Sequence, residues 1–161
     1  MAVFDGIIDE IISALRSDTQ LNDIKFIDSF KSYKRPNPLQ YNLVTVGIKK
    51  VELKDRAFGK YLGVINGNEF FGKGAEISIT LNIYVPKNKD GATTAEIFSR
   101  ICNTLISDNL EEQILSIECG DIDFNKSYDA FVLDCLLKLK VVIGSGNDES
   151  DITSIIIKGE I

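Results

Sequence analysis

The stretch AEISITLNIYVP, residues 75–86, decides the fold, because its side chains alternate strictly between apolar and mainly polar positions. Ile77, Ile79, Leu81, Ile83 and Val85 fall on one side of an extended chain, and the residues between them fall on the other. A period of two residues is typical of a strand with one face in the core. The stretch therefore predicts a half-buried strand of an antiparallel sheet.

Two segments with helical periodicity lie on either side of this strand in the sequence. Residues 3–15 carry apolar side chains at i, i+3 and i+4, and a similar stripe follows the turn NKDG over residues 97–106. Thr93, with Glu96 three residues later, predicts a capping box at the start of the second helix. Each helix has one apolar face, so each must pack against another element.

Further strands are predicted at residues 24–30, at 41–53 with a bulge at Gly47, at 114–124 and at 130–143. These elements predict an α+β fold, in which a mainly antiparallel sheet carries both helices on one face. Residues 1–143 form this single domain. Residues 144–161 form a linker, GSGNDES, followed by a C-terminal strand-like extension.

The composition argues against an enzyme. The 161-residue chain has no histidine, which excludes Ser-His-Asp and Cys-His nucleophiles and removes the commonest transition-metal ligand. Cys102, Cys119 and Cys135 have no CxxC spacing and are expected to be buried free thiols. Asp121 and Asp123 have no evident third partner for a metal. We therefore expect no catalytic residues, no cofactor and no metal site.

The charge and hydropathy patterns exclude further classes. The net charge of −6 disfavours specific nucleic-acid binding, which depends on clustered Lys and Arg. No apolar run approaches the length of a membrane span, and the first residues are acidic, unlike the basic start of a signal peptide. We expect a protein that does not bind membranes and stays in the cytoplasm where it is made.

Two segments depart from the regular patterns. DRAFGKYLGVINGNEFFGKG, residues 55–74, is rich in glycine and aromatic residues and predicts a long loop. Residues 152–161 are apolar and β-branched, and predict a strand that pairs with a sheet edge of its own or a neighbouring subunit. Exposed aromatic residues are enriched at interfaces, so both segments are predicted to contact another subunit. The predicted interface residues are Phe58, Tyr61, Phe70, Phe71, Ile152, Ile155 and Ile157.

Four motifs carry a family resemblance. They are KRPNP at 34–38, DRAFGKYLG at 55–63, KGAEISITLNIYVP at 73–86 followed by TAEIFSRICNTL at 94–105, and CGDIDFNKSYDAFVLDCLLKL at 119–139. Through them, residues 3–143 resemble the tail terminator proteins of tailed phages and of phage-derived contractile particles, such as R-type bacteriocins and defective prophages.

The resemblance implies a function in tail assembly. Such a small α+β protein forms a ring, typically a hexamer, that caps the tail tube, stops its polymerisation and offers a platform for the neck or collar. The implied partners are further copies of the chain, the tail tube protein, a neck or collar protein and, as a further candidate, the sheath protein. The implied location is a virion or phage-like tail particle, assembled in the cytoplasm of a bacterial host. The family has no catalytic residues.

Two alternatives remain. One is another head-completion or neck protein of similar fold, and the other is a small-ligand-binding α+β domain or an enzyme of unrecognised type. A monomer with a well-formed apolar pocket would favour the second.

Overall fold

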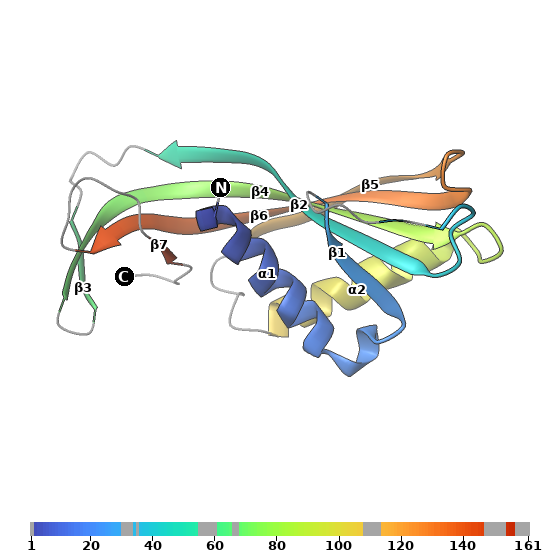
Figure 1. The fold of residues 1–161 in the computed structure, drawn as a ribbon, viewed down its shortest axis with the longest axis horizontal. Helices are drawn as coiled ribbons and strands as arrows, with labels where there is room; N and C mark the ends of the chain where they lie inside the picture. Colours follow the sequence, from blue (N-terminus) through green and yellow to red (C-terminus); the bar gives the residue numbers. More distant parts are fainter. Residues whose placement is uncertain are drawn as a thin grey trace.

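A computed structural model describes residues 2–29, 34, 36–54, 61–65, 68–107, 114–146 and 154–156. The predicted α+β fold is confirmed: two helices pack on one face of a mainly antiparallel sheet (Figure 1). The helices are α1 (Ala2–Ser17) and α2 (Ala92–Ser107), with a short 3-10 helix η1 (Thr19–Leu21). The strands are β1 (Ile24–Asp28), β2 (Asn42–Lys54), β3 (Tyr61–Ile65), β4 (Asn68–Pro86), β5 (Ile114–Asn125), β6 (Ala130–Gly146) and β7 (Ser154–Ile156).

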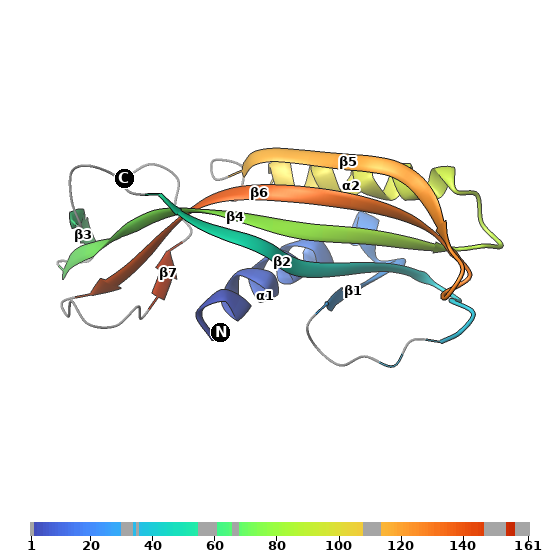
Figure 2. The same cartoon turned by 90° about the horizontal axis from the view of Figure 1, so that it is seen from above.

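The sheet is built around one long central pair of strands. Its order is β1-β2-β4-β6-β5, with β3 added to β4 and β7 added to β6. All pairs are antiparallel except β1 with β2, which is parallel. The partners of β4 and β6 run from Phe70 with Gly146 to Pro86 with Ala130, so this pair spans the length of the molecule (Figure 2).

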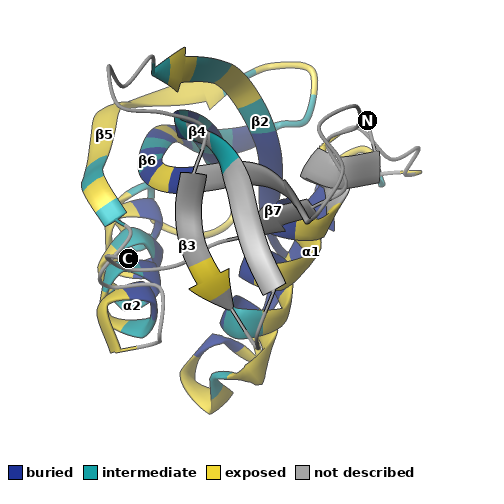
Figure 3. Cartoon of the chain, turned by 90° about the vertical axis from the view of Figure 1, so that its left-hand side faces the viewer, coloured by how far each residue is buried: buried dark blue, intermediate teal, exposed yellow. Residues whose placement is uncertain are grey.

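The core lies between the sheet and the two helices. Figure 3 views the molecule end-on, and the buried residues there are dark blue. The apolar side of β4 faces this core: Ile77, Ile79, Leu81, Ile83 and Val85 are fully buried, as the alternation predicts. Each such side chain contributes about 1.5–3 kcal/mol when it leaves water. The residues that cover or extend this surface include Ile8, Ile11 and Leu15 of α1, Ile97, Ile101 and Leu105 of α2, and Leu137, Leu139 and Val141 of β6.

A smaller apolar cluster lies on the opposite face of the sheet, at the β1 end. Ile27, Leu39 and Leu43 form it together with Ala130, and tyrosines pack around them. Tyr84 and Tyr128 meet edge to face, with ring centroids 5.7 Å apart. This cluster explains why a tyrosine occupies the mainly polar side of β4.

Two local predictions from the sequence are wrong. The bulge in β2 lies at Lys49 and not at Gly47, because Gly47 pairs regularly with Thr80, whose hydroxyl donates to the Gly47 carbonyl at 3.1 Å. The capping box at Thr93 is also wrong, because α2 already begins at Ala92. The Asp90 carboxylate accepts a hydrogen bond from the Ala92 N–H at 3.1 Å and so satisfies one of the N–H groups of the first turn of the helix.

The predictions of a long loop and of a linker from Gly144 are wrong for the residues that the structure describes there. β3 pairs with residues 68–71 of β4, so a hairpin occupies most of the segment predicted as a loop. Residues 144–146 belong to β6, where Gly144 pairs with Gly72 on one side and Ser154 on the other. The hydrogen bonds between strands join backbone groups, so a strand can form where the side chains do not alternate between apolar and polar. For this reason the sequence pattern does not predict these strands.

Candidate assembly surfaces

The central strand pair continues past the helices as an arm. We define the arm as β3, residues 68–74 of β4, residues 142–146 of β6, and β7. Beside β4, β2 pairs as far as Gly74, and β3 then pairs with residues 68–71. Beside β6, β5 pairs as far as Leu139, and β7 then pairs with residues 142–144. The arm projects beyond the ends of both helices in Figures 1 and 2.

The outer strands on the two sides of the central pair change at different levels where the arm joins the rest of the molecule. In the described pairings, Gly72 and Lys73 of β4 pair only with β6, and Lys140 and Val141 of β6 pair only with β4. Gly72 lies directly opposite Gly144, so no side chains meet at that pair. At Gly72 and Lys73 the third strand is β7, and at Val141 and Lys140 it is β2, so the arm is joined to the rest of the sheet through a three-stranded junction.

Apolar side chains are exposed where the helix layer ends. Leu53 of β2 is 56% exposed, although its cross-strand partner Ala75 is buried in the core. Val64 of β3, within the arm, is 58% exposed. Leu53 lies at the level of Ala75 of β4 and Val64 at the level of Glu69, so they are two separate apolar points along this end of the sheet that another molecule can contact. The arm and its junction therefore form a candidate assembly surface.

The arm brings together several residues that the sequence predicts at an interface. Tyr61 of β3 pairs with Phe71 of β4, and the neighbouring Phe70 pairs with Gly63. Ile155 lies in β7, which pairs with β6 of the same chain. The remaining predicted residues, Phe58, Ile152 and Ile157, lie outside the described residues.

A second apolar surface, which the sequence analysis did not identify, lies along the edge strand β5. We define the β5 flank as the exposed residues of β5 together with Ile106 of α2. Its apolar members, Ile106, Leu115, Ile122 and Phe124, are between 39% and 50% exposed. Apolar residues in a predicted strand are normally assigned to the core. The apolar pattern of residues 114–124 therefore does not reveal that some of these side chains are exposed.

Bulges explain the exposure of β5. Its pairing with β6 shifts between Ile114 and Ser116 and again between Cys119 and Ile122, so Leu115 and Gly120–Asp121 interrupt the regular ladder. A bulge bends its strand and redirects the neighbouring side chains. The signal in the sequence is the loss of alternation at CGDI, residues 119–122.

The three cysteines differ in their environments. Cys135 is buried, Cys102 is half-buried and Cys119 is exposed, so the expectation of a buried thiol is wrong for Cys119. The reason is that Cys119 lies on the edge strand, opposite Cys135. Burial, with a smaller contribution from the neighbouring thiols, raises the pKa of Cys135 to about 12. Burial is also the main cause of the raised pKa of Cys102.

These environments predict an order of thiol reactivity in the native protein. Cys119 is expected to react first with iodoacetamide, and Cys135 only after unfolding. At pH 8 a thiol with a pKa of about 12 is ionised in roughly one molecule in ten thousand, and the thiolate is the nucleophile. Mass spectrometry after timed labelling, with and without guanidinium chloride, measures this order. Rapid native labelling of Cys135 would contradict the burial of that side chain.

Comparison with known proteins finds no matching family model and no matching curated protein. Within the described ranges, no three His, Cys, Asp or Glu residues are grouped so that they could hold a metal ion. No helix among those residues is long and apolar enough to cross a membrane. The arm and the β5 flank are therefore two candidate assembly surfaces of the described chain.

Proposed function

We propose that this chain is a non-catalytic structural subunit of a phage or phage-like tail, which assembles as a ring on the end of the tail tube. The ring stops tube polymerisation and forms the platform for the neck or collar. The observation that carries this proposal is the arm, in which the sheet continues past the helices beside exposed Leu53 and Val64. The resemblance of the sequence motifs to tail terminators supplies the biological context.

A ring gives these apolar groups a partner. Removing apolar surface from water contributes about 25 cal/mol for each Å², and a closed ring provides the same contact for every subunit. The arm leaves the helix layer on one side of the molecule, where it can reach a neighbouring subunit or the tube. An isolated domain would gain nothing by holding such side chains in water.

The charge of the chain is compatible with the same role. With a net charge of −6, the protein has little general attraction for phosphate groups. In a particle that carries DNA, a ring of such subunits lets the DNA pass without holding it.

Deletion of the gene in the producing cell tests the proposal. We expect tubes longer than those of the wild type, with a broad distribution of lengths, because nothing blocks the growing end. Negative-stain electron microscopy measures the lengths, and expression of the wild-type chain in trans should restore them.

Other outcomes of the deletion identify the alternatives. Tails of normal length that lack heads or collars would contradict a terminator and favour a neck protein of similar fold. Particles indistinguishable from the wild type would contradict any role in the tail and favour the small-ligand-binding alternative.

A further inference from the structure

We propose that the β5 flank of one copy binds the opposite edge of the next copy, so that the ring closes by repeated head-to-tail contacts. This inference rests on the ring proposed above. We define the β1 flank as the exposed residues of β1 and Lys34 of the following loop, together with residues 47–54 of β2. The two flanks lie at the two ends of the strand order β1-β2-β4-β6-β5.

Both flanks have edges that are available for contact in the described part of the chain. There, β5 pairs only with β6, and β1 pairs only with β2. Beyond Val46, β2 pairs only with β4. Sheet edges of this kind are natural places for another chain to bind.

The β5 flank is acidic. Glu118, Asp121 and Asp123 are all exposed on β5. The Lys138 ammonium lies 3.5 Å from the Glu118 carboxylate and offsets part of this charge. The exposed Lys126 follows in the turn after β5. The flank therefore combines apolar side chains with a net negative charge.

The β1 flank is basic. Lys25, Lys34, Lys49 and Lys50 are exposed there. The Lys25 ammonium lies 5.3 Å from the centre of the Tyr41 ring, an arrangement that keeps the charge at the surface.

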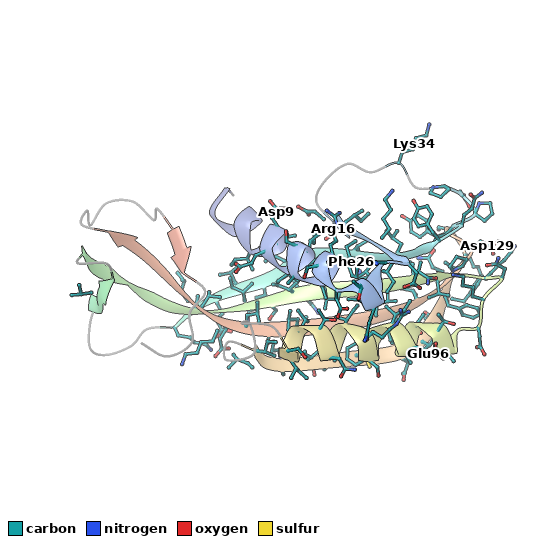
Figure 4. The ribbon with its side chains drawn as sticks, turned by 90° about the horizontal axis from the view of Figure 1, so that it is seen from below. Asp9, Arg16, Phe26, Lys34, Glu96 and Asp129 are labelled. Carbon is teal, nitrogen blue, oxygen red and sulfur yellow. The ribbon has the colours of Figure 1, made fainter. Side chains whose placement is uncertain are left out.

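Acidic groups on the β1 flank offset only part of this charge. Glu52 accepts hydrogen bonds from Lys54 at 2.9 Å and Lys50 at 3.1 Å, and these bonds hold its pKa below the usual value. Figure 4 places Asp9 and Arg16 of α1 on the same side of the molecule as Lys34. The basic residues outnumber the acids.

The directions of the strands allow the same orientation to repeat around a ring. β5 is antiparallel to β6, β6 to β4 and β4 to β2, while β1 is parallel to β2. β5 is therefore antiparallel to both strands of the opposite edge. A copy related by rotation about an axis along the strands places its β1 flank antiparallel to the β5 flank, as in an ordinary antiparallel sheet.

Opposite charges lie at the same level of the two flanks. Asp123 pairs with Val132, Val132 with Tyr84, Tyr84 with Leu43, and Leu43 with Lys25. The cross-strand partners thus lead in one line from an exposed acid on one edge to an exposed lysine on the other. A neighbouring copy at the same height would bring these two charges together.

A second acid on β5 has a matching base. Glu118 pairs with Leu136, Leu136 with Thr80, and Thr80 with Gly47. Lys49, the extra residue of the β2 bulge, lies two positions beyond Gly47. Glu118 and Lys49 therefore lie at nearly the same height on opposite edges.

The ends of the flanks nearest the arm are both apolar. Ile114 pairs with Leu139, Leu139 with Ile77, and Ile77 with Val51. The exposed Leu115 adjoins the first of these residues, and the exposed Leu53 lies two positions beyond the last. Leu115 lies on the Lys50 side of this level and Leu53 on the other, so the contact would place the two side chains on one apolar stretch, about two to three residues apart along the strands.

The charges also exclude the symmetric alternative. Two β5 flanks in contact would oppose acids to acids, and two β1 flanks would oppose lysines to lysines, both of which are destabilising. The bulges at Leu115 and Gly120–Asp121 interrupt the outer edge of β5, so side chains rather than a continuous backbone ladder make the contact.

Charge reversal on each flank tests this contact. The first variant carries Glu118→Lys and Asp123→Lys, and the second carries Lys25→Glu and Lys49→Glu. Each alone is expected to lose the ring, with association weakened about 100-fold or more, because like charges then face each other. An equimolar mixture is expected to restore a ring in which the two variants alternate. One chain that carries all four changes is expected to form a ring by itself.

A matched control carries Glu10→Lys on α1 and Lys140→Glu on β6, at exposed positions that belong to neither flank. It is expected to assemble as the wild type does. Size-exclusion chromatography with light scattering, with tail tubes added in a parallel series, measures the oligomer, and circular dichroism verifies the fold of each variant.

The outcomes separate this contact from the ring itself. A wild-type ring that persists in both single-flank variants would overturn the contact and leave the proposed function standing. Loss of the ring without rescue in the mixture or in the four-change chain would also overturn it. A wild-type chain that stays monomeric both alone and with tubes would overturn the ring and the contact together.

Discussion

Replacement of Phe26 with alanine is expected to lower the free energy of unfolding by about 3–5 kcal/mol. Phe26 is 1% exposed and packs in the main core, beneath α1 (Figure 4). Its carbonyl also accepts a hydrogen bond from the Arg16 guanidinium at 2.6 Å, which joins α1 to β1. β1 has five residues and pairs on one side only in the described chain, so it depends strongly on this side chain. Urea denaturation followed by circular dichroism measures the loss.

Leu53→Ala is the matched control, because Leu53 is also apolar and lies in the neighbouring strand but is largely exposed. Its effect on the free energy of unfolding of the monomer is expected to remain within about 0.5 kcal/mol. A loss of less than about 1 kcal/mol for Phe26→Ala would show that β1 is not held by the core and would contradict the packing described above.

The double substitution Phe70→Ser and Phe71→Ser is expected to abolish ring formation while leaving the monomer folded. Both residues lie in the arm, beyond the helix layer that covers the rest of the sheet. If they contact another subunit, their removal takes apolar area from the interface and not from the main core. The melting temperature of the monomer is then expected to fall by no more than about 2–4 °C, which corresponds to about 1 kcal/mol.

The control for this pair is Phe70→Leu with Phe71→Leu, which keeps the positions apolar and is expected to retain the ring. Light scattering and thermal unfolding are measured on the same samples. If the serine variant instead loses about 3–5 kcal/mol of free energy of unfolding, the phenyl side chains of Phe70 and Phe71 belong to the core of their own chain. A ring that survives the serine changes would remove the arm from the assembly contact.

The core of the fold could be predicted from the sequence because local patterns determine it. Alternation in β4 identifies the side that faces the helices, and the apolar stripes of α1 and α2 identify the helix faces that cover it. These signals depend on side chains within a few residues of one another. They therefore survive without any knowledge of how the strands are ordered.

The assembly surfaces could not be predicted in the same way. Glycines at positions 72 and 144 carry no apolar pattern, yet they face each other across the central strand pair. The exposure of Ile122 and Phe124 follows from a bulge and from the position of β5 at the edge of the sheet. The correspondence of Asp123 with Lys25 depends on four successive strand pairings, which no short window of sequence contains.

The narrow junction at Gly72 and Gly144 also bears on how the proposed ring would fit its target. Narrow sheets twist more than wide ones, and the Gly72–Gly144 pair brings no side chains together that would resist a twist. We therefore expect the arm to tilt at this junction more readily than the wider part of the described sheet bends. In a ring of such subunits, each arm can adjust its own angle. If the proposed ring forms, it would then be able to seat on a tube whose diameter or rotational symmetry differs slightly from its own.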